Sequence, residues 1–185
     1  IYNINASVGQ YLPNWRPNIN YKESVSAKMA LGGGALLELS HELDYLYWLF
    51  GDLQLKHSML RSSNELNLEV EDIVDLVLMS KDDICINLHL DFIQKETQRS
   101  CEVIAENGRL IWDLHKNCLY LHNSKGSKCI YTDPNYDKNN MYLDMLKAFE
   151  GIKSGVASDL ATLDSATQVL KMVDMAKKKN ILGAS

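Results

Sequence analysis

The sequence lacks long apolar runs and any broad excess of positive charge. None of its 185 residues lie in an apolar stretch of the ~18 residues that a membrane-spanning helix requires. The first ten residues also lack the basic start and long apolar stretch of a signal peptide. The net charge is −5 and the lysines are scattered, apart from a run at 177–179, whereas nucleic-acid-binding proteins gather positive charge on one face. We therefore expect neither a membrane nor a nucleic acid as a partner.

Cysteine is scarce and forms no CxxC pair. The four cysteines, Cys85, Cys101, Cys118 and Cys129, fall in separate predicted strands, which suits neither a zinc site nor a redox motif. We interpret them as reduced thiols in or near the core, typical of a reducing compartment. The sequence therefore predicts a cytoplasmic protein with no metal site.

A dinucleotide-binding fingerprint is missing as well. No GxGxxG motif stands between a strand and a helix, the arrangement with which Rossmann domains bind NAD or NADP. The chain begins with Ile1 instead of Met, so we expect an N-terminal part to precede it in the intact protein. Hydrophobic residues make up 46% and charged residues 23%, the values of an ordinary globular protein. Residues 1–185 are long enough to form a single domain with its own core.

Alternating apolar and polar residues predict a sheet across the middle of the chain. Turn signals such as Asn107-Gly108 separate the strands that follow an opening strand within 1–9. The connections are too short for crossover helices, so the strands must pair largely antiparallel. Within 84–91 the even-numbered residues are apolar, which predicts one face on a core and one toward water or a partner. The predicted strands are 53–62, 73–80, 84–93, 98–106, 109–113, 118–122 and 128–131.

Three segments have the apolar spacing of helices. Residues 35–50 contain no helix breaker and end before Gly51, where a helix C-cap is expected. Residues 138–154 and 158–179 carry apolar stripes that we interpret as core-facing, namely Met141, Met145, Ala148, Phe149 and Ile152, then Leu160, Leu163, Ala166, Leu170 and Val173. The sequence therefore predicts an α+β fold, a large predominantly antiparallel sheet with helices packed on one face and no Rossmann domain.

The candidate catalytic residues follow a run of three glycines at 32–34. On the helix predicted after it, His41 shares a face with Glu38, three residues earlier, and with Asp44, three residues later. A carboxylate that orients the imidazole near a helix N-terminus suits this histidine to take a proton near neutral pH. The alternative is a core or surface histidine held by a neighbouring acid.

Further candidates for substrate contact lie after the first predicted strand and in the glycine turn. Arg16 can pair bidentately with a carboxylate or phosphate of a substrate, or form a structural salt bridge. Tyr11 and Trp15 can pack on a sugar ring, or anchor their loop to the core. Gly33 and Gly34 would let the backbone come close to a ligand.

Together these segments resemble the C-terminal domain of the Gfo/Idh/MocA family, oxidoreductases named after glucose-fructose oxidoreductase and inositol dehydrogenase. The resemblance covers nearly the whole chain. It rests on Gly-Gln-Tyr-Leu-Pro-x-Trp-Arg-Pro at 9–17, on the glycine turn with His41-x-x-Asp44, and on Trp48-x-x-Gly51. It extends to Asp-Phe-Ile at 91–93, to Glu-Asn-Gly at 106–108 and to the last helix.

The resemblance implies one half of a two-domain enzyme. An N-terminal Rossmann domain, absent from this chain, would bind NAD or NADP. This domain would contact a sugar-like substrate and form a homodimer or homotetramer through its sheet, and the isolated chain would be inactive. The residue at the place of His41 takes part in proton transfer in such members, aided by an acid. That acid is commonly Asp with three residues between, whereas Glu38 has two, so Asp44 competes for the role.

Two other functions stay open at this point. The 11–17 segment resembles members associated with bacterial surface-sugar biosynthesis, which favours an enzyme. A small-ligand sensor would keep the pocket without the chemistry. A dimerisation module would use only the second face of the sheet, because a half-apolar antiparallel face usually meets another copy or another domain.

Overall fold

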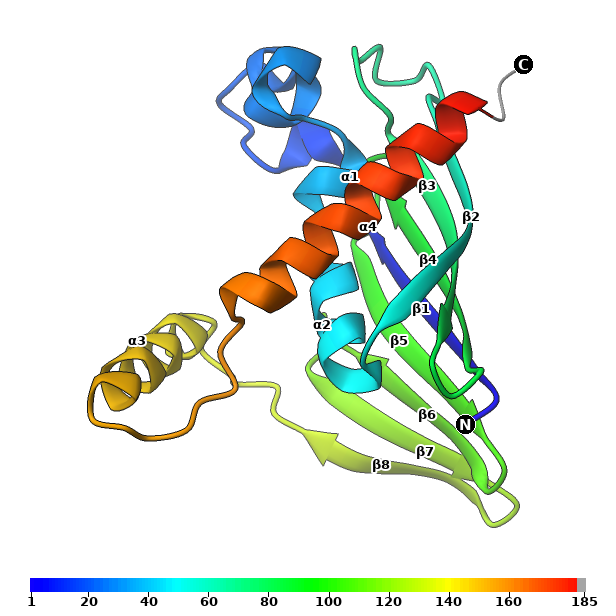
Figure 1. Ribbon diagram of the computed structural model, residues 1–185, viewed down its shortest axis with the longest axis vertical. Helices are drawn as coiled ribbons and strands as arrows, with labels where there is room; N and C mark the ends of the chain where they lie inside the picture. Colours follow the sequence, from blue (N-terminus) through cyan, green and yellow to red (C-terminus); the bar gives the residue numbers. More distant parts are fainter. Residues whose placement is uncertain (183–185) are drawn as a thin grey trace.

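An eight-stranded sheet forms the frame of the molecule (Figure 1). The computed structural model describes residues 1–182, so 183–185 of the predicted single domain lie outside the described residues. All seven strands predicted between 53 and 131 form, each within two residues of its predicted ends. The strands are β1 Asn3–Gly9, β2 Leu53–Arg61, β3 Ile73–Ser80, β4 Cys85–Asp91, β5 Gln98–Ala105, β6 Gly108–Asp113, β7 Cys118–Asn123 and β8 Gly126–Thr132.

The strand order is β2-β3-β4-β1-β5-β6-β7-β8, which places the first strand of the chain at the centre of the sheet. β1 pairs antiparallel with β5 but parallel with β4. All other neighbours pair antiparallel. The predicted largely antiparallel sheet is therefore confirmed with one exception. β1 and β4 can pair in parallel because the chain between them is long. It comprises residues 10–52 and then β2 and β3.

The connection from β1 to β2 consists of short helices. They are η1 Leu12–Asn14, η2 Tyr21–Glu23, η3 Val25–Ala27, η4 Met29–Leu31, α1 Ala35–Glu38 and α2 His41–Phe50. The single helix predicted at 35–50 is thus two helices. The N–H of Ser40 bonds to the carbonyl of Leu37, and the N–H of Glu42 bonds to that of Leu39. These bonds span three residues instead of four, so the chain tightens and turns between α1 and α2.

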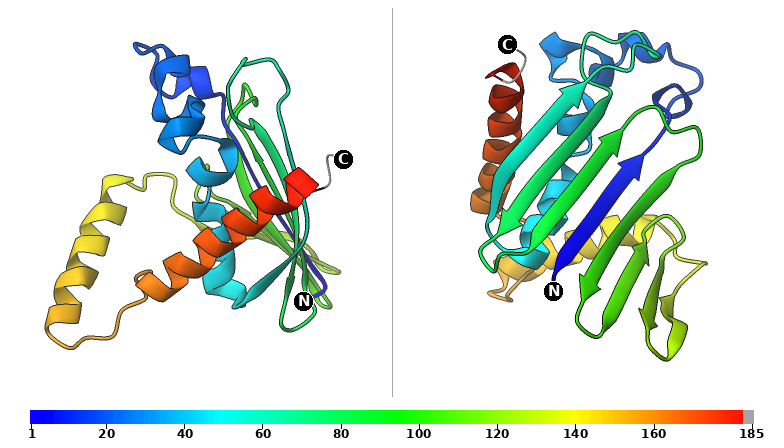
Figure 2. Two further views of the ribbon diagram at one scale, coloured as in Figure 1. Left: turned by 45° about the horizontal axis from the view of Figure 1, so that its top comes forward. Right: turned by 90° about the vertical axis from the view of Figure 1, so that its right-hand side faces the viewer.

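The core lies between one face of the sheet and the helices α1, α2 and α4 (Figures 1 and 2). The even-numbered residues of β4 are buried, as predicted, and Asn87 on the other face is exposed. Helix α4, Leu163–Leu182, packs on β2 and α2. The predicted core stripe of this helix is only partly right, since Val173 is buried whereas Leu163 and Leu170 are exposed. The residues it does bury are Val169, Met172, Val173 and Ala176.

Helix α3, Asn139–Lys153, stands away from the sheet on the side that carries the other helices (Figures 1 and 2). It contains no buried residue. Phe149 is 59% exposed and Met141 54%. The prediction that the apolar stripe of this helix faces the core is therefore wrong for the described residues, because nothing in them covers it.

The sheet has a second face that carries no helix (Figure 2). The four cysteines are free and lie in four different strands, as predicted. Their expected position in or near the core is wrong for Cys129, which is exposed on the edge strand β8. Within residues 1–182, none of the helices combines the length and the apolar character that crossing a membrane requires.

Candidate functional site

His41 is the first residue of α2 and lies beside a buried ion pair. Its side chain is 49% exposed, and its Nε2 lies 3.3 Å from Oε1 of Glu42. Glu42 is fully buried, and the same Oε1 accepts a hydrogen bond of 2.7 Å from Nε of Arg99 in β5. A buried carboxylate needs such a counter-charge. The helix start thus places an imidazole next to a carboxylate whose position the sheet fixes.

The surroundings of His41 keep its imidazole neutral. Burial raises the pKa of the Glu42 carboxyl, and the guanidinium of Arg99 opposes this rise. Burial, and then the positive charge of Arg99, lower the pKa of His41 to about 4. At neutral pH His41 is therefore an uncharged imidazole. In this domain alone it is a weaker base than the expected one that titrates near neutral pH.

Two further buried polar groups, from Tyr45 and Cys101, lie close to Glu42. The hydroxyl of Tyr45 lies beside Glu42 and Cys101, and burial raises the pKa of this hydroxyl far above its usual range. Burial also raises the pKa of the Cys101 thiol to about 11. The Tyr45 ring packs edge-on against Trp112, with 5.8 Å between ring centroids. Both Tyr45 and Cys101 stay protonated at neutral pH, so Glu42 is the acidic group among the three.

Neither acid predicted to orient His41 lies within ion-pair distance of it among the described residues. The break between α1 and α2 separates Glu38 from the helix of His41, so their spacing of three no longer implies a shared face. Asp44 does share the helix and the side of His41. Whether either acid acts in catalysis stays a prediction, and the acid in contact is Glu42.

Sequence reasoning missed Glu42 and Arg99. Adjacent residues of a helix do not normally face each other, so spacing gave no reason to pair His41 with Glu42. A signal was present, because Glu42 stands with Leu43 and Leu46 on the buried side of α2. A charged residue among core positions of an amphipathic helix is almost never fully buried unless it is paired. Arg99 could not be found this way, since it comes from a strand far along the sequence.

The loop candidates surround a small pocket. Trp15, Arg16 and Glu38 line a cavity of about 80 Å³ together with Leu12, Ile19, Tyr21, Ser24 and Ser26. Arg16 is exposed and has no salt bridge in the part of the chain that the structure describes. The structure therefore brings three predicted site residues together and leaves the guanidinium available.

The two loop aromatics are held by the protein itself. Trp15 packs edge-on against Phe92, with 5.3 Å between ring centroids. The ammonium of Lys95 lies 3.5 Å from the centroid of the Tyr11 ring, a cation–π arrangement that occupies one face of the ring. These contacts favour the anchoring role that the sequence left open. Sugar contact by Tyr11 or Trp15 stays a prediction.

The glycine turn packs against the chain's own atoms. A Cβ at Gly33 would lie 2.6 Å from the backbone oxygen of Ser26, and one at Gly34, where φ is +112°, would lie 2.4 Å from a carboxylate oxygen of Glu71. That carboxylate accepts a 3.2 Å hydrogen bond from the N–H of Leu36 in the first turn of α1. An acid thus occupies the helix start where a phosphate would bind. The turn does not fit a dinucleotide, and substrate contact by Gly33 and Gly34 stays a prediction.

Comparison with known proteins gives the family. A profile described as the GFO/IDH/MocA C-terminal domain matches residues 1–111. The chain belongs to the GFO/IDH/MocA family. Comparison with curated protein sequences gives no match.

Solved structures share the fold of this GFO/IDH/MocA domain. Levoglucosan dehydrogenase in complex with NADH has a TM-score of 0.81 and 14% identity, with 98% of this chain and 56% of that chain covered. An NAD binding oxidoreductase from Klebsiella pneumoniae has a TM-score of 0.79 and 13% identity, with 97% and 57% covered. Aldose-aldose oxidoreductase from Caulobacter crescentus, complexed with glycerol, has a TM-score of 0.76 and 16% identity, with 98% and 54% covered.

The similar solved structures confirm the architecture of the domain. The domain has the mostly antiparallel sheet of the C-terminal domains of GFO/IDH/MocA oxidoreductases, and the described residues contain no Rossmann-type fold. The chain spans about half the length of the solved chains that it matches. The predicted family and the predicted fold are both confirmed.

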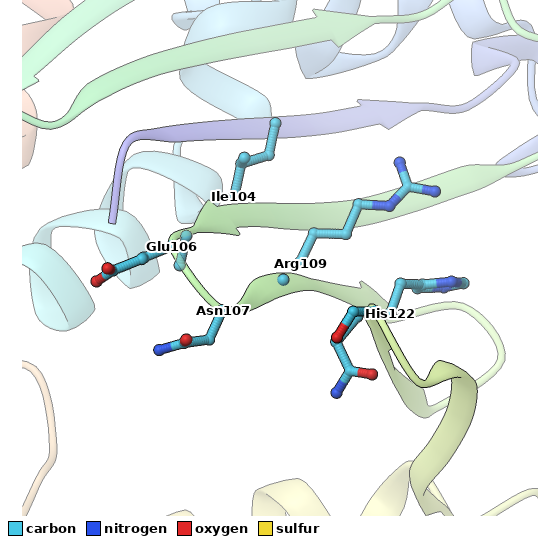
Figure 3. Close-up of a pocket in the computed structure, with 9 residues that line it drawn as sticks. Ile104, Glu106, Asn107, Arg109 and His122 are labelled. Carbon is cyan, nitrogen blue, oxygen red and sulfur yellow. The ribbon is translucent and has the colours of Figure 1, made fainter.

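A larger hollow of the domain lies away from His41, at the turns of β5–β6 and β7–β8. Its volume is about 580 Å³. Glu106, Asn107 and Arg109 line it, but their side chains point in different directions (Figure 3). A ligand site needs polar groups that converge, so this hollow is a weaker candidate than the surroundings of His41. Within residues 1–182, no cluster of three or more His, Cys, Asp or Glu side chains could hold a metal ion.

Proposed function

We propose that the chain is the substrate-side domain of an NAD- or NADP-dependent oxidoreductase that acts on a CH–OH group of a sugar or sugar derivative. The observation that carries this proposal is the geometry of the half-exposed His41 at the start of α2, with its Nε2 3.3 Å from the Glu42 carboxylate that Arg99 pairs. The family supports it. So do the names of similar structures, among them a levoglucosan dehydrogenase and an aldose-aldose oxidoreductase.

In this proposal His41 handles the proton of the reaction. When an alcohol carbon gives up a hydride, the hydroxyl proton must pass to a base. His41 accepts it, and in the reverse direction the imidazolium returns it. In this proposal an N-terminal Rossmann domain of the intact protein holds NAD or NADP, and the glycine turn of this chain, filled by the Glu71 carboxylate, supports that assignment.

Two features bear on the substrate. Arg16, exposed at the pocket with Trp15 and Glu38, offers a planar donor group to a carboxylate or phosphate on the sugar. The pocket of about 80 Å³ is small beside the roughly 300–1,000 Å³ of typical ligand sites. The sugar site must therefore be completed by the other domain. The sequence of the 11–17 loop favours a sugar of bacterial surface-polysaccharide biosynthesis, and the free thiols fit a cytoplasmic enzyme.

The test uses the intact protein, expressed from its own start codon, with a panel of sugars and nucleotide sugars and with NAD and NADP. We expect His41→Ala to lower kcat/KM by roughly 10²- to 10⁴-fold, the usual contribution of a general base. The control is His57→Ala, at an exposed position of edge strand β2. Unchanged turnover in His41→Ala would remove this histidine from the mechanism and favour a sensor.

Glu42 is a positioning residue in this scheme, and its variant separates orientation from proton transfer. Glu42→Gln keeps the shape but removes the charge that faces His41 and Arg99. We expect a smaller loss of kcat than in His41→Ala and a shift of the pH–kcat profile, because the imidazole then titrates beside an amide and an unpaired guanidinium. A profile identical to that of the unchanged protein would contradict the positioning role.

The open face of the sheet supports a second function that is compatible with the first. We propose that copies of the chain pair through this open face, either as a homodimer or within a homotetramer. Asn5, Asn87 and Glu102 form a hydrogen-bonded row across β4, β1 and β5 on this face. The described helices all lie on the opposite side (Figure 2).

A further inference from the structure

The loop of residues 10–16 rests on the chain that follows β4. The N–H of Gln10 donates to the carbonyl of Asp91 at 3.1 Å, and the N–H of Leu12 donates to the carbonyl of Phe92 at 3.0 Å. These backbone bonds set the course of the loop where it leaves β1. The position of the loop therefore depends on how Asp91 and Phe92 are held.

Side chains join the same two segments. Trp15 packs edge-on against Phe92, and the ammonium of Lys95 lies over the ring of Tyr11. Arg16 follows Trp15 directly, and both line the pocket of about 80 Å³. The guanidinium that the proposed function offers to the substrate is thus carried by a loop that this packing places.

Asp91 holds the chain after β4 with both oxygens of its carboxylate, and it is 1% exposed. Its Oδ1 accepts hydrogen bonds of 2.9 Å from the backbone N–H groups of Ile93 and Gln94, and its Oδ2 accepts one from the side-chain amide of Gln94. The imidazole of His89 contacts the same Oδ2 and reaches Asp75 with its other nitrogen. Loss of these bonds would leave buried donors unsatisfied, so the network fixes the backbone around it.

Gly9 lets this network lie directly over the end of the central strand. It pairs with Asp91 across β1 and β4, and a Cβ at this position would lie 2.0 Å from the amide nitrogen of Gln94. Only a residue without a side chain leaves that space. The end of β1, the loop after it and the chain after β4 are thus packed as one unit.

We propose that Asp91 and His89 are positioning residues of the sugar site, which hold the 10–16 loop so that Arg16 meets an anionic group of an acidic sugar. Neither residue lines the pocket of Arg16, so both act through the loop and not on the substrate. The inference rests on the proposed function, because it takes from it the role of Arg16.

Kinetics of the intact protein with a carboxylate-bearing sugar, a sugar phosphate and the uncharged parent sugar test the proposal. Asp91→Asn replaces one of the two acceptor oxygens by a donor. We expect the KM for the acidic sugar to rise by roughly tenfold at an unchanged kcat, because a displaced Arg16 weakens ground-state and transition-state binding alike. The KM for the uncharged sugar should stay the same. A protein that prefers the uncharged sugar to both acidic ones would contradict the assigned substrate class.

A double-mutant cycle shows whether Asp91 acts through Arg16. In an Arg16→Ala background the further substitution Asp91→Asn should change the KM for the acidic sugar by less than about twofold, because the group that Asp91 positions is gone. If the two effects multiply, Asp91 does not act through Arg16 and the proposal is wrong.

Ser80→Ala is the matched control. Ser80 lies at the other end of the β3–β4 pair and is 5% exposed, and its hydroxyl accepts hydrogen bonds of 3.2 Å from the N–H groups of Asp82 and Ile84. This variant also loses buried hydrogen bonds of a turn, but far from the 10–16 loop. Both KM values should stay unchanged. An equal rise in Ser80→Ala and Asp91→Asn would show that general loss of stability is the cause.

Hydrogen exchange of the Gln10 and Leu12 amides in the intact protein measures the loop without any substrate. We expect exchange to accelerate in Asp91→Asn, and also in His89→Gln, which alters a half-exposed position and serves if the buried variant does not fold. Ser80→Ala should exchange like the unchanged protein. Unaltered exchange in both loop variants would overturn the proposal.

The outcomes separate the positioning role from the proposed chemistry. If the loop loosens as expected but the intact protein oxidises no sugar, the proposed function fails, while Asp91 stands as the group that holds the loop. If the protein oxidises an acidic sugar and Asp91→Asn leaves its KM unchanged, the positioning role is wrong and the chemistry stands.

Discussion

The surroundings of His89 act on its pKa in the opposite direction to those of His41. The Nδ1 of His89 lies 2.7 Å from a carboxylate oxygen of Asp75, and its Nε2 lies 3.0 Å from one of Asp91. Asp91 is buried and also accepts hydrogen bonds from Gln94. The bond to Asp91, and then that to Asp75, raise the pKa of His89 to about 9 against the opposing effect of burial. His89 is therefore an imidazolium at neutral pH.

The raised pKa of His89 predicts how the stability of the domain changes with pH. A group with a folded pKa of about 9 and an unfolded value near 6.5 stabilises the fold fully below pH 6.5. This contribution disappears as the pH rises through 9. We expect the free energy of unfolding of the intact protein, measured with urea, to fall over this interval. In His89→Gln the fall should be smaller, so the two proteins should converge at high pH.

The control for this prediction is His57→Gln, an exposed histidine on the edge strand β2. It should reproduce the pH dependence of the unchanged protein. A His89→Gln protein whose stability falls as steeply as the unchanged one would show that other groups carry the pH dependence.

The sequence indicated a candidate histidine but not the residues that contact it. His41 was selected by its spacing from Glu38 and Asp44 after the glycine run, and the family resemblance supplied its role, which stays a prediction. Its contact Glu42 was not found, because adjacent residues of a helix do not normally face each other. Arg99 supplies the counter-charge from β5, and the pairing of distant segments is not encoded in local spacing. Arg16, Trp15 and Glu38 do meet at one pocket.

At the scale of elements, the glycine turn before α1 provides a test of close packing. Gly34, with φ 112° and ψ 149°, and Gly51, with φ 73° and ψ −154°, both have backbone angles that are nearly restricted to glycine. They differ in their surroundings, because a Cβ at Gly34 would meet Glu71, whereas nothing lies within 4 Å at Gly51. The two glycines are therefore a matched pair.

We expect Gly51→Ala to lower the free energy of unfolding by about 1–3 kcal/mol from backbone strain alone. Gly34→Ala should cost about 1 kcal/mol more, because the added methyl group displaces the Glu71 carboxylate from the N–H of Leu36. Urea unfolding of both variants measures the difference. Equal losses would mean that the contact between Glu71 and the start of α1 contributes nothing.

Strands were easier to predict than the roles of helices for a physical reason. Short turns and period-two alternation are local signals, and several of the strands from β2 to β8 carry them. An apolar stripe shows only that a helix has a partner. It does not show whether the partner lies in the same domain, so the stripe of α3 was wrongly assigned to this core. In the described part of α4 the buried residues lie between 169 and 176, which spacing cannot reveal.

At the scale of the whole molecule, the sheet separates two surfaces that differ in polarity. The helix side has large exposed apolar residues, Trp48 and the stripe of α3, and needs a body that removes them from water. The open side is polar, with Asn5, Asn87 and Glu102 already bonded to one another. Non-obligate interfaces are about as polar as the rest of a protein surface, so a polar face can still serve as one. The two sides can therefore bind different partners at once.

Asn87, exposed on the open face, provides the test of self-association. In a two-fold interface the same patch is used by both copies, so each substitution is introduced twice. Asn87→Arg adds bulk and charge to β4 beside β1 and should convert the oligomer of the intact protein to monomer in sedimentation. Asp82→Arg, in the exposed turn between β3 and β4, introduces the same side chain at the end of the sheet and should leave the assembly intact. An unchanged protein that sediments as a monomer at high concentration, or an Asn87→Arg variant that still associates fully, would exclude the open face as the interface.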